Sequence, residues 1–333
     1  MRLLITVPDQ SEATGNLVTA RRLQAGLAEF GLFSELALLP DVDPLPAYRQ
    51  ACKTLCPDAV LLLHAWRTGR AWLRSRDELP LPAAVLLTGT DIHGGLDDSE
   101  QGPVIRAVLE SADLLLTQNH LTAANLIATW GNKVHHLPPA VQLGTTPYLL
   151  REQHQIPADA ILFLHPAGIR PIKANFDLLW LCDPLAARHK EFRLAFCGPV
   201  LDPVYGAAFL AAVTQRPWAS WLGVIPSGAM PAALAAADVV LNHSRSEGLP
   251  GALLEALAVG RAILAHDIPG NAAIIDAGGN GLLYSDSSEF LRQAEGLIND
   301  PEQRQRLATA PRPDLSPKTE AATLAALLRT LHS

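Results

Sequence analysis

The chain has 333 residues, of which 49% are hydrophobic and 18% are charged, and its formal net charge is −7 at pH 7. This length is more than one hydrophobic core usually serves, so two domains are expected. The charge balance is acidic without a long basic run, which argues against a nucleic-acid partner because such binding normally needs a basic face. The composition suits a soluble enzyme built on buried parallel sheet.

The N-terminal stretch MRLLITVPDQ has an apolar run of only five residues, which is shorter than the core of a signal peptide. No other stretch approaches the roughly 20 apolar residues of a transmembrane helix. We therefore expect a cytoplasmic protein without a transmembrane segment. Peripheral contact with a membrane surface stays compatible with the sequence.

Four cysteines, Cys52, Cys56, Cys182 and Cys197, are scattered along the chain. Cys52 and Cys56 have helical spacing and could share a metal, but no second pair of cysteines or histidines lies near them. Reduced thiols in the core of a cytosolic protein are the better interpretation.

Short apolar runs recur along the first half, each followed by polar or glycine residues and then by a helical pattern. In chain order they are Leu3–Val7, Phe33–Leu38, Ala59–Leu63, Ala84–Leu87 and Leu114–Thr117. Continuous apolar runs of this length, alternating with helices, indicate strands that are buried on both faces. The first half is therefore predicted to form a Rossmann-like domain with a parallel sheet.

The same pattern returns in the second half, with runs at Ile161–Leu164, Arg193–Cys197, Val239–Leu241 and Ala262–Ala265. The sequence thus predicts an α/β fold of two Rossmann-like, doubly wound parallel sheets. The polar connection at residues 147–158 places the division there, with domains at 1–150 and 151–316. A final helix at 317–333 follows a proline-broken stretch and is expected to pack back on the junction.

Open parallel sheets bind ligands beyond the carboxyl ends of their strands, so the loops after the apolar runs are searched first, facing a cleft between the domains. The stretch NHSRSEGLPGALLEALAVG, residues 242–260, leaves one such strand. A helix is predicted from about Ala252 to Val259 because the residues there are rich in Ala and Leu. Glu247 stands before this helix and Glu255 inside it.

Two acids around a glycine turn and a helix N-terminus point to a particular ligand. Gly248 and Gly251 let backbone approach a ligand closely, and the helix N-terminus favours a phosphate. Carboxylates repel phosphate but accept hydrogen bonds from sugar hydroxyls. A nucleotide sugar, with hydroxyls on both sides of a phosphate, fits this order. The alternative is a helix-capping acid followed by a solvated one.

The stretch SEGLPGALLEA resembles the E-x7-E element of the family-4 retaining glycosyltransferases, which have the GT-B fold. The stretches WLGVIPSGAMPAALAAADVVLNHS and GRAILAHDIPGNAAIIDAGGNGLLYSD are also similar to that family, so the resemblance covers roughly residues 160–300. Other stretches of the chain resemble a narrower group, which contains the glycosyltransferase 1 domain-containing proteins and the bacterial selenosugar synthases. The residues that carry this second resemblance are ATGNLVTARRL, TGTD at 88–91, GIRPIK at 168–173, GPVLDPV at 198–204 and, for the synthases, HAWRTGR at 64–70.

The resemblance implies roles for the residues of this stretch. Glu247 would contact the donor sugar and Glu255 the ribose. The backbone of Leu249, Pro250 and Gly251, beside Gly248, would lie along the diphosphate and the sugar. Backbone groups of Gly223, Val224 and Ile225 would meet the nucleobase.

Arg170 and Lys173 follow the apolar run at 161–164, and two cations in a site without a metal can hold a diphosphate leaving group. The family has an arginine and a lysine here, usually more widely spaced. A solvated basic turn is the alternative. Gly15 and Asn16 are expected in the loop after the first strand, where the family closes a loop on the diphosphate. An ordinary turn between a strand and a helix is the alternative.

Three first-half residues are candidates for the acceptor side. Thr90 and Asp91, in TGTD, follow one predicted strand, and His64 ends another. Many family members have a histidine at the end of the TGTD strand, where this chain has glycine or threonine. For Asp91 a turn-forming role is the alternative. For His64 the favoured interpretation is a core histidine with satisfied hydrogen bonds.

The D-x-D pattern of Asp41 and Asp43 resembles the metal motif of a different glycosyltransferase fold, but it lies in a proline-bound loop without that scaffold. We therefore expect no essential divalent metal and no cofactor. Ala273 stands where the family often has glutamate, so the donor sugar is left open.

The sequence predicts a glycosyltransferase, here a metal-independent hexosyltransferase, that moves a sugar from a nucleoside diphosphate donor, with uridine as the expected base, to an unidentified acceptor. Retention at the anomeric carbon is the expected outcome. One alternative is selenosugar synthesis with selenophosphate as the nucleophile, which would invert that carbon. Others are a nucleotide-sugar-binding protein without turnover and a nucleotide-sugar epimerase. A dehydrogenase is disfavoured because no G-x-G-x-x-G follows the first strand.

Overall fold

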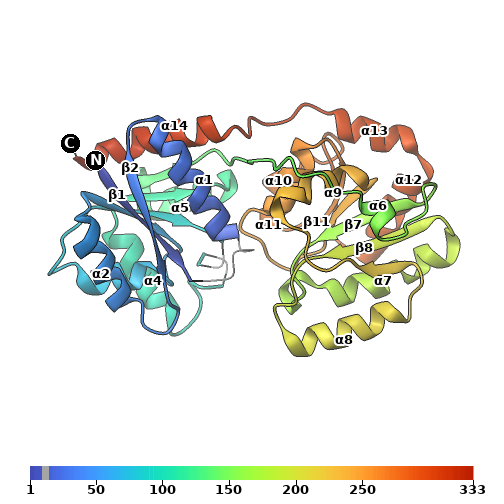
Figure 1. Cartoon of the computed structure of the whole chain (residues 1–333), viewed down its shortest axis with the longest axis horizontal. Helices are drawn as coiled ribbons and strands as arrows, with labels where there is room; N and C mark the ends of the chain where they lie inside the picture. The colour runs from blue at the N-terminus through green and yellow to red at the C-terminus, as the bar shows by residue number, and fades with distance from the viewer. Residues whose placement is uncertain (10–14, 90, 93, 333) are drawn as a thin grey trace. The chain divides into compact units, whose positions relative to one another are not determined.

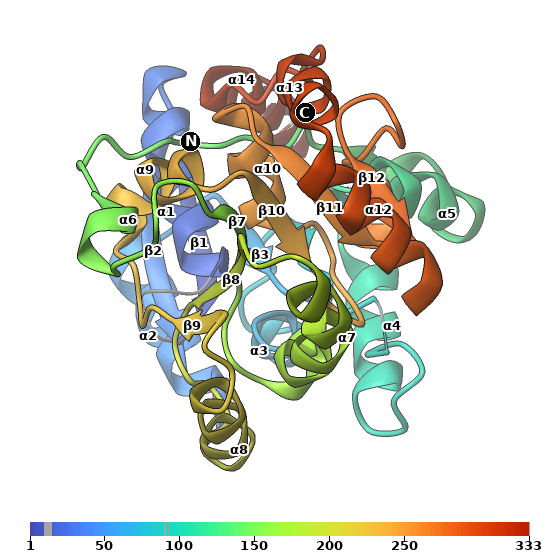
Figure 2. The ribbon, with the colours of Figure 1, turned by 90° about the vertical axis from the view of Figure 1, so that its right-hand side faces the viewer.

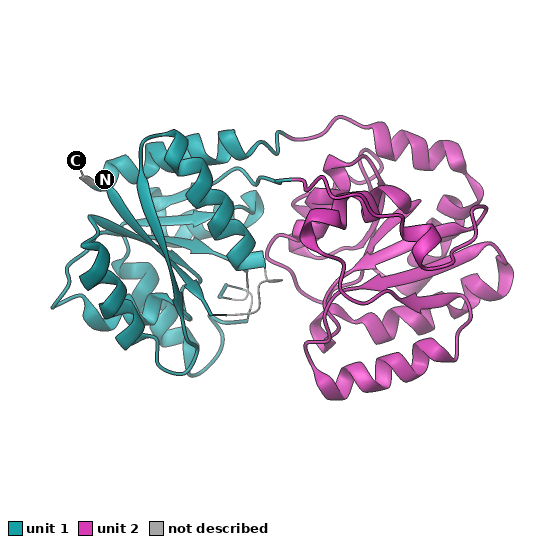
Figure 3. Ribbon diagram, viewed as in Figure 1, with its two compact units in different colours: residues 1–142, 314–333 teal, residues 143–313 magenta. Residues whose placement is uncertain are grey.

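A computed structural model of the chain describes residues 1–9, 15–89, 91–92 and 94–332 (Figure 1). The chain divides into two compact units: unit 1 is residues 1–142 with 314–333, and unit 2 is residues 143–313 (Figure 3). The first boundary therefore lies earlier than the division expected at residue 150. The C-terminal helix is part of unit 1 and not a separate segment.

Unit 1 contains a six-stranded parallel sheet in the order β2-β1-β3-β4-β5-β6. Its strands are β1 (Arg2–Pro8), β2 (Phe33–Leu39), β3 (Ala59–Leu63), β4 (Ala83–Leu87), β5 (Leu114–Thr117) and β6 (Val134–His136). The five apolar runs of the first half are five of these strands, which confirms the predicted parallel sheet. The sequence analysis missed β6 because an edge strand of three residues, two of them histidines, carries no apolar run.

Helices pack on both faces of this sheet, and for that reason its central strands β1, β3, β4 and β5 are buried along their length without alternation. On one face, Leu4 lies in a cluster with Tyr48 and Trp72. On the other, Leu3 lies in a cluster with Leu324. The helices are α1 (Gly15–Glu29), α2 (Leu45–Leu55), α3 (Gly69–Ser75), α4 (Gln101–Ser111), α5 (His120–Trp130) and α14 (Pro317–Arg329), with short 3-10 turns η1 (Gly131–Lys133) and η4 (Thr330–His332).

Helix α14 lies directly against α1, although the two are at opposite ends of the chain (Figure 1). A Cβ atom added at Gly26 would stand 2.6 Å from the Cβ of Ala321, so the two helices approach each other as closely as a glycine allows. Beside this contact, Glu320 of α14 binds Arg22 of α1 through two hydrogen bonds. The C-terminal helix therefore completes the core of unit 1.

Unit 2 contains a second six-stranded parallel sheet, in the order β12-β11-β10-β7-β8-β9. Its strands are β7 (Ile161–Pro166), β8 (Phe192–Cys197), β9 (Ala219–Trp221), β10 (Val239–Asn242), β11 (Ala262–His266) and β12 (Leu282–Tyr284). The four predicted runs are the four central strands. The outer strands β9 and β12 have three residues each and were not predicted.

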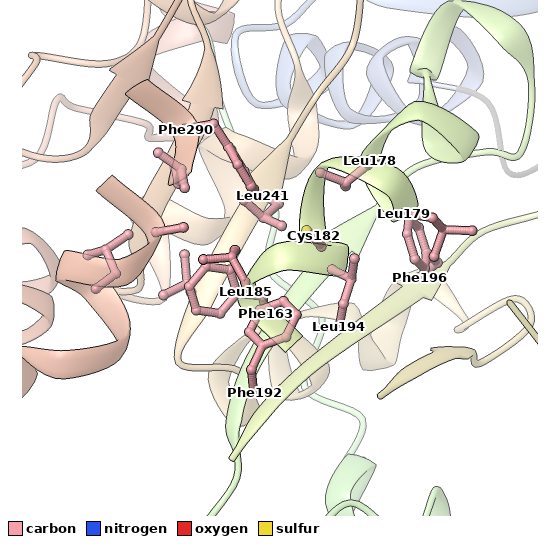
Figure 4. Close-up of a cluster of buried hydrophobic side chains, with 14 of the residues drawn as sticks. Phe163, Leu178, Leu179, Cys182, Leu185, Phe192, Leu194, Phe196, Leu241 and Phe290 are labelled. Carbon is pink, nitrogen blue, oxygen red and sulfur yellow. The ribbon is translucent and has the colours of Figure 1, made fainter. Parts of the chain in front are cut away.

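A large apolar cluster fills one face of the unit 2 sheet (Figure 4). Phe163 and Phe192 of neighbouring strands meet edge to face, with ring centroids 5.3 Å apart, and α12 lies beside β12 (Figure 2). The helices are α6 (Leu150–Gln153), α7 (Asn175–Arg188), α8 (Pro203–Thr214), α9 (Met230–Ala236), α10 (Gly251–Ala258), α11 (Pro269–Ala272), α12 (Ser287–Asn299) and α13 (Pro301–Thr309), with 3-10 turns η2 (Pro171–Lys173) and η3 (Ser227–Ala229).

Among the helices that the structure describes, none is both long enough and apolar enough to cross a membrane.

Candidate functional site

The candidate site lies in unit 2, where the carboxyl ends of β7, β8, β10 and β11 form one edge of the sheet. All four strands are parallel and hydrogen-bonded in sequence across the sheet, so the loops that follow them emerge at this same edge. These loops carry Arg170 and Lys173 after β7, Glu247 after β10 and Gly270 after β11. The topology thus brings together residues from distant parts of the chain.

Glu247 is held by three donors that converge on one of its carboxylate oxygens. Lys173 Nζ, Ser244 Oγ and Asn242 Nδ2 donate to Glu247 Oε1 at 2.5, 2.6 and 3.3 Å. The Glu247 side chain is 12% exposed and that of Lys173 is 16% exposed. None of the donors in the described part of the chain reaches Glu247 Oε2, so the second oxygen can still accept a hydrogen bond from a ligand or water.

The pKa of Glu247 lies below its usual value. Burial alone would raise it, but the charge of Lys173 and the hydrogen bonds from Lys173, Ser244 and Asn242 outweigh that effect. Glu247 is therefore a charged acceptor at neutral pH. The two cations expected at the diphosphate have different surroundings. Lys173 is paired with Glu247, whereas the Arg170 side chain is exposed at the start of η2.

A glycine and an asparagine after β11 support the Glu247 loop, and the sequence analysis assigned neither of them a role. A Cβ atom at Gly270 would lie 2.5 Å from the Glu247 carbonyl oxygen, so only glycine permits this contact. Asn271 is fully buried and donates to the His266 carbonyl oxygen at 2.8 Å. The signal that could have found them is the PGN triplet shortly after a strand, where it begins α11.

Helix α10 begins at Gly251, directly after the Glu247 loop. No side chain among the described residues caps this end, and the first turn contains no acid. A Cβ atom at Gly251 would meet nothing within 4 Å, so the space in front of the helix end is open. The unpaired N–H groups and the positive end of the helix dipole make this a suitable place for an anion.

Glu255 lies in α10, and its charge acts on the end of β8. Burial and, after it, the negative charge of Glu255 raise the pKa of the Cys197 thiol to about 12, which places the carboxylate near the last residue of β8. The following loop contacts the expected nucleobase segment, since Gly198 N donates to the Gly223 carbonyl at 2.9 Å. In that segment Gly223 has a φ of +75°, Val224 is exposed and Ile225 is buried. Glu255 and the Gly223 loop thus lie at the same end of the sheet.

Three histidines that the sequence analysis did not single out lie at this edge. His165 at the end of β7 is fully buried, and its Nδ1 is 3.0 Å from the Leu241 carbonyl oxygen. His243 Nδ1 is 2.6 Å from the Tyr284 hydroxyl, and His266 Nδ1 is 3.1 Å from the Ser244 carbonyl oxygen. His165 and His266 thus hold backbone carbonyls at the end of β10 and in the loop that presents Glu247, and His243 ties that loop to the Tyr284 side chain. Histidines at the ends of three neighbouring apolar runs are the sequence signal.

Burial lowers the pKa of His165 to about 4, and burial followed by the charges of His165 and His266 lowers that of His243 to about 4. In the unfolded chain both should titrate near pH 6.5. Unit 2 therefore has the full stability contribution of these neutral rings above about pH 6.5 and loses it as the pH falls toward 4. At pH 5 the loss should be about 2 kcal/mol for each ring.

The variant His243→Gln tests this linkage. Urea unfolding at pH 7 and pH 5 should show a smaller loss of unfolding free energy for the variant than for the unchanged chain, by about 2 kcal/mol. Equal losses in the two proteins would show that His243 is not held neutral by the fold.

In unit 1, Asp91 has a structural role. It is fully buried and accepts hydrogen bonds from the backbone N–H groups of Ala65, Thr88 and Gly89 at 3.0, 3.1 and 2.9 Å. His64 is also buried, and its Nδ1 accepts from the N–H groups of Trp66 and Arg67 at 3.2 and 3.3 Å. Asp91 therefore holds the turns after β3 and β4 together. Thr90 lies outside the described residues.

Gly15 and Asn16 are the first two residues of α1 and not part of the preceding loop, which corrects the expected placement. The D-x-D acids pair with arginines instead: Asp41 with Arg67 at 3.5 Å and Asp43 with Arg74 at 3.7 Å. Within the residues that the structure describes, no group of three or more His, Cys, Asp or Glu side chains could hold a metal ion. Cys52, Cys182 and Cys197 are buried as expected, whereas Cys56 is exposed.

Comparison with known proteins gives a consistent result for the sequence and for the fold. Residues 149–312 match the family model described as glycosyl transferases group 1. The chain is 27% identical over 320 residues to the glycosyltransferase 1 domain-containing protein 1 of Xenopus tropicalis, covering 89% of this chain and 87% of that protein.

Among the solved structures that are similar over the whole chain are the following two. One is Anabaena HepE in complex with UDP-glucose, with a TM-score of 0.80 and 17% identity, covering 100% of this chain and 99% of that one. The other is sucrose-phosphate synthase from Thermosynechococcus elongatus, with a TM-score of 0.78 and 17% identity, covering 99% and 98%. These structures have the GT-B fold, so the fold predicted from the sequence is confirmed.

Proposed function

We propose that this chain, a glycosyltransferase of the GT-B fold with a group 1 glycosyl transferase domain at residues 149–312, uses a uridine diphosphate sugar as its donor. It transfers the sugar to an acceptor without an essential metal or a cofactor. The donor binds at the strand edge of unit 2, with Glu247, Glu255, Arg170 and the start of α10 as its principal contacts. The uridine follows from HepE, which was crystallised with UDP-glucose.

The observation that carries this proposal is the arrangement around Glu247. A buried, charged carboxylate has Lys173 on one oxygen, and its other oxygen can accept from a sugar hydroxyl. Beside it, the uncapped N-terminus of α10 can take the diphosphate, and Glu255 can accept hydrogen bonds from the ribose hydroxyls. Hydroxyl, phosphate and hydroxyl recognition thus follow one another in the order of a nucleotide sugar.

In the transfer, the bond between the anomeric carbon and the diphosphate oxygen breaks, and the diphosphate leaves with the electron pair. The acceptor forms the new bond to that carbon and loses its proton. The charge that grows on the leaving diphosphate is stabilised by Arg170 and by the N–H groups of α10. Lys173 positions Glu247, which orients the sugar.

Turnover tests the proposal. The chain supplied with UDP-glucose or UDP-N-acetylglucosamine and a panel of hydroxylic acceptors should release UDP and form a glycoside, with the anomeric configuration retained. Selenophosphate belongs in the same panel, since a selenium-linked product of inverted configuration would favour selenosugar synthesis. Binding of the donor without turnover on any acceptor would instead favour a nucleotide-sugar-binding protein. Absence of both binding and turnover would contradict the proposal.

A further inference from the structure

Unit 1 contains a cavity of about 450 Å³ at the carboxyl end of β3. Four of its lining residues, His64, Trp66, Arg67 and Arg70, come from the HAWRTGR stretch that joins β3 to α3. Asp41 and Gln101 line it as well. A cavity of this size fits a small molecule, and its wall combines cations with an aromatic ring.

The backbone at the start of this stretch is strained. His64 has a φ of +83°, a conformation that residues other than glycine rarely adopt. Such residues cluster at ligand sites, where the surrounding structure holds them in place. Here the side chain supplies part of that support, because His64 Nδ1 accepts hydrogen bonds from the backbone N–H groups of Trp66 and Arg67. The turn that carries the arginines is therefore built around this residue.

Arg70 is the cation whose charge the described residues do not neutralise. Its guanidinium lies 4.6 Å from the centre of the Trp66 ring and donates to the backbone carbonyl of Asp41. Its Nε is buried and has no hydrogen-bond partner among the described residues, and none of their carboxylates pairs with it. Arg70 as a whole is partly exposed, but an unpaired donor at a buried atom costs free energy unless a ligand or water accepts from it.

The two acids beside the cavity are already occupied. The Asp41 carboxylate pairs with Arg67 at 3.5 Å. Asp98 Oδ1 accepts from the N–H groups of Glu100 and Gln101 at 2.9 and 2.8 Å, before the start of α4. The formal charges of Arg67 and Arg70 balance those of Asp41 and Asp98. Among the described residues Arg70 is the lining cation that has no carboxylate partner, so its guanidinium is the group that can bind an anion.

We propose that this cavity binds an oxyanionic group, a phosphate or a carboxylate, on the acceptor of the transfer reaction, with Arg70 as its principal contact. A guanidinium forms paired hydrogen bonds with such groups, and stacking on Trp66 holds its plane in position. The assignment of the anion to the acceptor rests on the proposed function. The binding of the anion by Arg70 does not.

Three probes that differ in a single group test the cavity on the full chain: glycerol 3-phosphate, glycerate and glycerol. Titration calorimetry is done with UDP at saturation, so that the diphosphate position in unit 2 is filled. At least one of the two anions should bind, and glycerol should not. Which of the two binds more tightly identifies the phosphate or the carboxylate as the group that is recognised.

The matched variants are Arg70→Gln and Arg74→Gln. Both residues are on α3, but Arg74 is exposed, pairs with Asp43 and does not line the cavity. Loss of a charged hydrogen bond should weaken binding of the anion by about tenfold or more in Arg70→Gln. Arg74→Gln should bind as the unchanged chain does. Equal affinity in both variants, or no binding of either anion by the unchanged chain, would overturn the proposal.

Two further measurements separate the possible failures. If Arg70→Gln does not fold, Arg70→Lys keeps the charge and removes the paired donors, and it should weaken binding of the anion by about threefold or more; unchanged affinity would overturn the role of Arg70. If UDP does not bind the unchanged chain, the proposed function fails, while a difference between Arg70→Gln and Arg74→Gln still establishes the anion site.

Discussion

Replacing Glu247 by glutamine should lower the turnover number for UDP-glucose by about 100-fold or more, the effect usual for loss of one well-placed polar contact in the transition state. The amide is neutral, so it leaves the partly buried ammonium of Lys173 without its counter-charge. It also replaces a carboxylate with a neutral amide, which accepts hydrogen bonds from sugar hydroxyls less strongly. The measurement is UDP release under saturating donor.

Arg245→Gln is the matched control for this variant. Arg245 belongs to the same loop, but its side chain is exposed and pairs with Asp177 at 2.6 Å, away from Glu247. The turnover number of Arg245→Gln should stay within about twofold of that of the unchanged chain, because an exposed ion pair contributes little to the stability of the loop. Turnover of Glu247→Gln close to that of Arg245→Gln would remove Glu247 from the reaction.

A variant of Lys173, the ion-pair partner of Glu247, tests whether this lysine positions Glu247 or contacts the substrate itself. If Lys173 acts only by holding Glu247 Oε1, as their 2.5 Å contact suggests, Lys173→Met should lower the turnover number by a similar factor. The double variant should then be no slower than either single one, since the two changes remove one interaction. Multiplicative losses would show that Lys173 contacts the substrate independently.

Replacing Glu320 by glutamine should destabilise unit 1 by about 3–5 kcal/mol, the usual result of removing one partner from a buried ion pair. Glu320 is 1% exposed, and its carboxylate receives Arg22 Nε at 2.7 Å and Nη2 at 2.8 Å. Gln118 Nε2 donates to it as well, at 2.5 Å. The variant leaves the Arg22 charge buried and unpaired between α1 and α14.

Urea unfolding measures this loss, and Glu29→Gln is the matched control because Glu29 is an exposed acid at the end of α1. The control should change the free energy of unfolding by about 0.5 kcal/mol or less. A loss below about 1 kcal/mol for Glu320→Gln would show that α14 is not an essential part of the unit 1 core.

The sequence predicted the central strands of both sheets because residues buried on two faces must be apolar throughout. It missed β6, β9 and β12 because edge strands of three residues need no such run. It placed Gly15 in a loop because a glycine is a weak signal for the first residue of a helix. The division at residue 142 was also missed, since α14 returns to unit 1 through contacts that local patterns do not contain.

The same reasoning explains what was found of the site. Glu247, Glu255 and the glycines between them lie in one short segment, so their spacing relative to the strand and helix could be read directly. The ion pair of Lys173 with Glu247 joins residues that are 74 positions apart, and it exists because β7 and β10 are neighbours in the sheet. Strand order is not visible in the sequence of a single chain. The supporting His266 and Gly270 were missed for the same reason.

The central claim is that the strand edge of unit 2 binds a nucleotide sugar, and a crystal structure of the chain with UDP-glucose tests it most directly. It should show the ribose hydroxyls within hydrogen-bond distance of Glu255 and the diphosphate at the N-terminus of α10 beside Arg170. The glucose should contact Glu247 Oε2. A nucleotide bound elsewhere, with Glu255 touching neither ribose nor base, would contradict the account.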